Sequence, residues 1–157
     1  MSDFSESDHR FMELALAQAA KAEQLGEVPV GAVVVLENEV IAEACNQQIT
    51  LNDPSAHAEV LALRSAAAAL GNYRLPDCEL FVTLEPCTMC CGAMVHARVS
   101  RLVFGTREPK AGAVASTSSA LDNASLNHRV EWAEGLCADE SANLLRAFFK
   151  ARRATKV

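Results

Sequence analysis

The sequence predicts an α/β fold in which a β-sheet lies between layers of helices. Three observations lead to this prediction. Helical and strand-like segments alternate along the chain, residues suited to a helix start precede three of the helical patterns, and the strand-like segments are apolar and rich in β-branched residues. The length of 157 residues favours a single domain over residues 1–157.

The first third of the chain is predicted to form a helix followed by a hairpin. Apolar residues follow the helical period over residues 8–25, and Gly26 ends the pattern. Residues 28–36 and 40–45 are β-branched and apolar, and a short polar turn separates them, so they are expected to pair. Gly31 inside the first of these strands indicates a close approach of another backbone.

The middle of the chain is predicted to alternate between helix and strand. A helix over residues 54–70 is expected, because Asp53 can cap it and a proline is tolerated in its first turn. A strand over 78–84 leads directly into a helix over 86–97, and a strand over 99–104 follows.

The last third begins with an irregular segment, residues 105–128, with a possible short helical turn at 118–122. A short strand over 129–132 and a basic C-terminal helix over 138–153 complete the prediction. The apolar residues expected on the core side of this helix are Leu144, Leu145, Phe148 and Phe149.

The charge is unevenly distributed along the chain, although the formal net charge is −6. The segment from Ser141 to Val157 has no acidic residue and five basic ones, whereas the preceding 140 residues have nine basic and twenty acidic ones. The five are Arg146, Lys150, Arg152, Arg153 and Lys156. This asymmetry indicates either an anionic partner or a helix end whose cations complement the helix dipole.

The apolar runs are too short to span a bilayer, and the acidic N-terminal segment lacks the features of a signal peptide. We therefore expect a cytoplasmic protein without a membrane partner, in which the six cysteines are reduced.

Two of these cysteines indicate a metal site. Cys87 and Cys90 follow Pro86 at a predicted helix start, where residues three apart share a face and the helix dipole favours thiolates. Cys91, four residues after Cys87, is a less favoured alternative ligand.

His57 and Glu59 open another predicted helix. A His-x-Glu followed by Pro-Cys-x-x-Cys is the signature of the zinc-dependent nucleobase deaminases, in which one His and two Cys bind zinc. Zinc lowers the pKa of a bound water to about 7, and a carboxylate that moves protons can serve both water attack and amine departure. Helical periodicity alone does not bring Glu59 to the side of His57.

Five segments resemble the bacterial tRNA-specific adenosine deaminases, and the similarity extends over nearly the whole chain. They are Val28-Pro29-Val30-Gly31-Ala32, Asp53-Pro54-Ser55-Ala56-His57-Ala58-Glu59, Thr83-Leu84-Glu85-Pro86-Cys87, Val103-Phe104-Gly105 and Asn127-His128-Arg129-Val130. The resemblance implies a cytidine-deaminase-like fold, a three-layer α/β/α sandwich with a mixed five-stranded sheet, that works as a homodimer. It also implies conversion of the wobble adenosine of an arginine tRNA anticodon to inosine, with release of ammonia.

The resemblance also assigns roles to single residues. His57, Cys87 and Cys90 would hold one Zn²⁺ per subunit, and Glu59 would move protons. Asn46 would hydrogen-bond the flipped base, and the backbone near Glu85 would meet the departing amine. The remaining residues expected to line the pocket or contact the substrate are Val30, Ala58, Leu84 and Glu108, the last at a position where many relatives carry Asp.

The resemblance gives the basic residues a partner, the anticodon arm of tRNA. Phosphate contacts are expected from Arg107, Lys110, Arg146, Lys150, Arg152 and Arg153. Two other functions stay open. A deaminase of a free base or nucleotide would keep the zinc site without needing a basic helix, and a non-catalytic zinc or RNA-binding module would normally close its metal site with four protein ligands.

Overall fold

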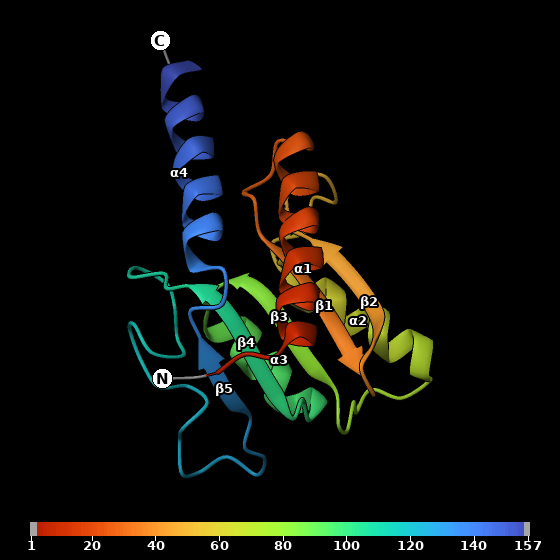
Figure 1. The fold of residues 1–157 in the computed structure, drawn as a ribbon. Coiled ribbons are helices and arrows are strands. Elements are labelled where there is room, and N and C mark those ends of the chain that lie inside the picture. Colours follow the sequence, from red (N-terminus) through yellow and green to blue (C-terminus); the bar gives the residue numbers. More distant parts are fainter. Residues whose placement is uncertain (1–2, 156–157) are drawn as a thin grey trace.

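A mixed five-stranded sheet forms the centre of the protein in the computed structural model, which describes residues 3–155 (Figure 1). Its strands are β1 (Gly31–Leu36), β2 (Glu39–Cys45), β3 (Glu79–Leu84), β4 (Arg101–Thr106) and β5 (Glu131–Glu134), in the order β2-β1-β3-β4-β5. β1 is antiparallel to both β2 and β3, whereas β3, β4 and β5 are parallel to one another. The predicted α/β class and mixed sheet are confirmed.

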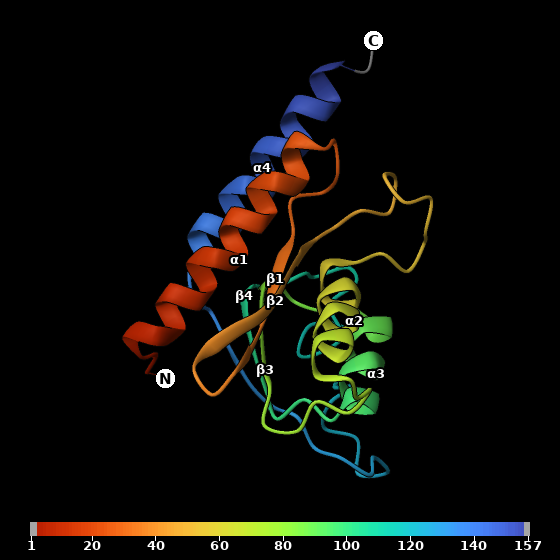
Figure 2. The same cartoon turned by 90° about the vertical axis from the view of Figure 1, so that its right-hand side faces the viewer.

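Helices cover both faces of this sheet. They are α1 (Glu6–Gln24), α2 (Ala58–Leu70), α3 (Thr88–Ala97) and α4 (Ala138–Thr155). Figure 2, which views the sheet on edge, shows α1 and α4 on one side and α2 and α3 on the other. Alternate residues of each strand serve the two layers, so that Val33 faces the α1 side and Val34 the α2 side. The predicted three-layer sandwich is therefore confirmed.

The packing of α1 on β1 depends on Gly31. A Cβ atom at this position would lie 2.0 Å from the carbonyl oxygen of Ala15 and 2.5 Å from the backbone nitrogen of Ala19. The glycine thus permits the close backbone approach that the sequence indicated. The helix itself begins earlier than predicted, because Ser5 forms a capping box with Asp8.

The starts of α2 and α3 differ from the prediction in a way that matters for the site. His57 is the N-cap of α2, with extended dihedral angles of −72° and 152°, so the helix begins at residue 58 and not at 54. Residues before it form a turn in which the Asp53 carboxylate binds the amide and hydroxyl of Ser55. Cys87 is likewise the extended N-cap of α3, and Pro86 precedes the helix instead of opening it.

The last helix, α4, extends beyond the sheet (Figure 1). Its expected core side chains are confirmed only for Leu145, which is half-buried and packs against the core. Phe149 is 40% exposed, and Leu144 and Phe148 are only half-buried. The reason is that only the first turns of α4 reach the sheet, where Ser141 is buried.

The helical turn expected at residues 118–122 is absent, because these residues form no helix. The predicted basic residue Lys156 lies outside the described residues. Within residues 3–155, no helix has the length and apolar character needed to cross a membrane.

Candidate metal centre

The N-termini of α2 and α3 bring three potential metal ligands together. His57 and Cys87 are the two N-cap residues, and Cys90 lies in the first turn of α3. The sulfur of Cys87 is 3.6 Å from Nδ1 of His57 and 3.8 Å from the sulfur of Cys90, and the Cys90 sulfur is 3.5 Å from the same nitrogen. Among residues 3–155, these three form the one group of this kind that could hold a metal ion.

These distances fit zinc. Zinc bonds of about 2.3 Å to sulfur and about 2.0–2.1 Å to nitrogen, at tetrahedral angles, separate two sulfurs by about 3.8 Å and a sulfur from a nitrogen by about 3.6 Å. The observed separations agree with both values. A structural zinc site would need a fourth protein ligand, and this group has three.

Glu59 lies beside these ligands although only one residue separates it from His57. Because His57 has an extended backbone, its side chain does not follow the helical period, and both side chains reach one pocket. Glu59 is 4% exposed and lines the same pocket as His57 and Cys87. Burial raises the pKa of Glu59 to about 7, the range in which a carboxyl group serves as both acid and base.

The two thiols differ in their ionisation when no metal separates them. The hydrogen bond between the two sulfurs and a second one with His57 lower the pKa of Cys87 to about 3. The hydrogen bond between the sulfurs, together with burial, raises the pKa of Cys90. The expected preference of the helix N-terminus for two thiolates is therefore seen at Cys87 alone, because two neighbouring sulfurs share one proton.

The group opens into a pocket of about 190 Å³. Of the residues expected around the base, the structure brings these to its lining: Val30, Asn46, Leu84, Glu85 and Glu108. Ala58 does not line it; its backbone N–H instead donates to the Asn46 side-chain oxygen at 2.8 Å. Sequence reasoning missed Val28, Gln48 and Ala111, whose side-chain types carry no chemical signal.

A basic groove of about 700 Å³ continues from Glu108 along α4. Four of the six expected phosphate-binding residues line it, namely Lys110, Arg146, Lys150 and Arg153, together with the exposed ring of Phe149. The other two do not line this groove, although Arg107 lines a hollow beside it together with Arg146. Arg152 lies over the ring of Phe148 on another side of α4, and Arg107 forms a two-point ion pair with Glu134 at 2.7 and 2.8 Å.

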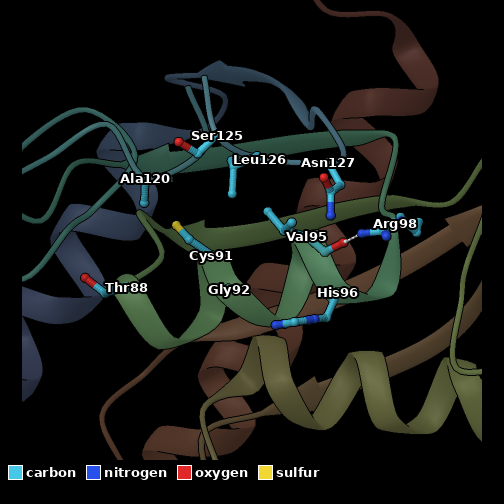
Figure 3. A pocket seen from close by; sticks show the side chains of 10 residues that line it. All are labelled: Thr88, Cys91, Gly92, Val95, His96, Arg98, Ala120, Ser125, Leu126 and Asn127. Carbon is cyan, nitrogen blue, oxygen red and sulfur yellow. Dashed lines mark hydrogen bonds between the residues drawn. The ribbon is translucent and has the colours of Figure 1, made fainter. Parts of the chain in front are cut away.

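A separate hollow of about 390 Å³ lies on the other side of α3, between this helix and the segment 120–127 (Figure 3). Cys91 points into this hollow, and its sulfur lies 4.0 Å from the carbonyl oxygen of Pro86. Cys91 is not part of the group formed by His57, Cys87 and Cys90. Its burial raises its pKa to about 12, as expected for a packed thiol.

The sequence matches a known family over a region that contains all three candidate ligands. Residues 5–106 match the family model of the cytidine and deoxycytidylate deaminase zinc-binding region. The chain is 48% identical over 153 residues to a tRNA-specific adenosine deaminase of Haemophilus influenzae. This alignment covers 97% of this chain and 88% of that protein. It is also 48% identical over 143 residues to a tRNA-specific adenosine deaminase of Agrobacterium fabrum, covering 91% and 94% of the two chains.

Solved structures are similar as well. A structure from work on A-to-I editing by tRNA:A34 deaminases at the wobble position matches with a TM-score of 0.85 and 47% identity, over 87% of this chain and 99% of that one. A guanine deaminase from Nitrosomonas europaea matches with a TM-score of 0.75 and 25% identity, over 94% and 86% of the chains. The fold thus accommodates different nucleobases, and the sequence is much closer to the first structure.

Proposed function

The chain belongs to the family of tRNA-specific adenosine deaminases, and we propose that it hydrolyses the wobble adenosine of an arginine tRNA anticodon to inosine and ammonia. The observation that supports this proposal best is the continuity of the site. A three-ligand group and a buried carboxylate open into one small pocket, and the pocket is joined at Glu108 to a groove lined by cations.

His57, Cys87 and Cys90 would hold one Zn²⁺ per subunit, and the ion would supply a water activated at neutral pH. Glu59 would take the two protons of that water in succession, delivering the first to the ring nitrogen and the second to the departing amine. Its burial removes bulk water from the path of these protons. A single carboxylate can serve both steps because it alternates between its two protonation states.

Asn46 would orient the base. Its side-chain oxygen is engaged by the N–H of Ala58, so its amide hydrogens are the groups available to the pocket. These hydrogens can donate to a ring nitrogen of adenine. Val30 and Leu84 would provide apolar contact to the ring, and the backbone at Glu85 would meet the departing amine.

The anticodon arm would lie along the basic groove, with Lys110, Arg146, Lys150 and Arg153 near phosphates. Glu108 connects groove and pocket and would contact the substrate between them. We further propose that residues 1–157 act as a single deaminase domain, that two copies associate as a homodimer, and that the enzyme acts in the cytoplasm on tRNA.

A single-turnover assay of the zinc-loaded protein tests this function. An arginine anticodon stem-loop with adenosine at the wobble position should be deaminated, and free adenosine, cytidine and guanine should not. The similarity to a guanine deaminase supports a free-base deaminase as the second candidate. Comparable turnover of free guanine, with none on the stem-loop, would establish that alternative.

A further inference from the structure

The carboxylate of Glu85 holds a set of backbone amides that the proposed chemistry does not use. Glu85 follows β3 directly and is 3% exposed. Its oxygens accept from the N–H groups of Glu108 at 3.0 Å, Val114 at 3.1 Å, Ala115 at 2.8 Å and Ser116 at 2.9 Å. The hydroxyl of Ser116 also donates to it. A buried carboxylate is therefore satisfied by one loop, and no ion pair with Glu85 occurs within residues 3–155.

The loop wraps closely around this side chain. A Cβ atom at Gly112 would lie 2.3 Å from the carboxyl carbon of Glu85, so only glycine allows the backbone to pass there. The amide of Ala113 donates to the carbonyl of Pro86 at 2.8 Å. The loop is thus fastened both to Glu85 and to the residue that precedes the candidate ligand Cys87.

The same loop builds part of the active-site pocket. Glu108 and Ala111 line the pocket together with His57 and Glu59, and Glu108 also lines the basic groove. The segment between β4 and β5 contains no helix or strand. Its shape therefore depends on specific anchors, and hydrogen bonds to a charged acceptor are the strongest of these.

We propose that Glu85 is a positioning residue, whose carboxylate fixes residues 108–116 as the wall of the pocket against which the substrate base is held. The substrate half of this inference rests on the proposed function, whereas the anchoring of the loop does not. Glu85 acts through the loop and not on the reacting atoms, so its loss should weaken substrate binding more than it slows the chemical step.

The variant Glu85→Gln tests the anchor. One carboxylate oxygen accepts from the amide of Glu108 and the hydroxyl of Ser116, and the other accepts from amides 114–116, whereas glutamine of the same size keeps an acceptor at only one of these two positions. Either amides 114–116 or the amide of Glu108, whichever faces the new NH₂ group, should exchange with deuterium at least ~10-fold faster, the scale of one lost hydrogen bond to a charged group. Zinc content and the exchange of β3 and α2 should stay as in the unmodified protein. Unchanged exchange of the amide of Glu108 and of amides 114–116 alike would overturn the proposal.

Kinetics on the anticodon stem-loop separate positioning from a purely structural role. We expect KM to rise ~10-fold or more in Glu85→Gln, with kcat changed less than ~3-fold, because binding of the base depends on the wall while Glu59 and the ligands stay in place. A faster-exchanging loop with unchanged KM would refute the role as a wall.

If Glu85→Gln fails to fold or to bind zinc, two serine variants test whether the anchored loop supports substrate binding. Ser116→Ala removes the hydroxyl bond to Glu85, and a KM rise of ~3-fold with faster loop exchange is expected. Ser119→Ala, an exposed serine of the same segment without this bond, is the matched control. Identical behaviour of the two variants would overturn the proposal. An inactive unmodified protein whose loop exchange still depends on Glu85 would instead overturn the proposed function.

Discussion

Replacing Asn46 by aspartate tests how the pocket recognises a base. The Asn46 oxygen accepts the N–H of Ala58, and an aspartate oxygen can accept it in the same way. Ala58 is the first residue of α2, so the helix N-terminus favours the ionised form of the new side chain. Asn46→Asp should therefore keep the local fold and remove only the donor that faces the pocket.

The size of the effect follows from the groups involved. Loss of one hydrogen bond costs about 0.5–1.5 kcal/mol, and a buried acceptor left facing another acceptor costs a further ~1–3 kcal/mol. Together they predict a fall of roughly 13- to 2,000-fold in kcat/KM for the anticodon stem-loop, about 1.5–4.5 kcal/mol. Asn46 is 7% exposed, so water compensates little of this loss.

Steady-state kinetics on the stem-loop, with metal analysis of the same samples, measure this loss. Asn46→Ala is the comparison, since it removes both the donor and the acceptor and should also loosen the start of α2. If Asn46→Asp retained full kcat/KM with normal zinc content, Asn46 would have no donor role toward the substrate.

Three further predictions concern the carboxylate, the groove and the fold. Glu59→Ala should bind zinc normally and lose at least ~100-fold in single-turnover rate; zinc loss measured by metal analysis would instead make Glu59 a ligand. Reversal of Arg153, which lines the groove, should weaken stem-loop binding and its salt dependence more than reversal of Arg152 on the other side of α4, by filter binding at several salt concentrations. Burial opposes ionisation of Asp8, but hydrogen bonds from Arg101 and Ser5 outweigh it and lower the pKa of Asp8. Asp8→Asn should therefore reduce the unfolding free energy of the metal-free protein by about 1–3 kcal/mol at pH 7, and urea titrations should show this difference shrinking as the pH falls below 3.8.

Local patterns predicted the layers of the fold but not the course of its last helix. The helical period of α4 is correct, yet the same period is compatible with a helix that crosses the sheet or one that leaves it. Leu145 and Phe149 were expected in the core for this reason, and Phe149 instead lies on the exposed groove. Where a helix ends relative to a sheet is decided by packing elsewhere in the chain.

The loop after β4 shows a second limit of sequence reasoning. Glu85 stands out in sequence only as part of a motif, because its partners are backbone amides, which every residue possesses. Gly112 was the one sign in the sequence that this loop passes close to another group, since a glycine often marks a close backbone approach. The group that it approaches, the carboxylate of Glu85, lies 27 positions earlier in the sequence, and nothing in the sequence connects the two.

The helix starts explain why the ligands are these residue types. Two helix N-termini meet at the candidate centre, and each carries a partial positive charge that disfavours a bare cation. Two thiolates would offset the charge of Zn²⁺, and hydrogen bonds with Cys90 and His57 already lower the pKa of Cys87. The extended N-cap at His57 has a further consequence, because it frees the imidazole from the helical period. This departure from regular helix lets a His-x-Glu pair place a candidate ligand and a candidate proton carrier in the same pocket.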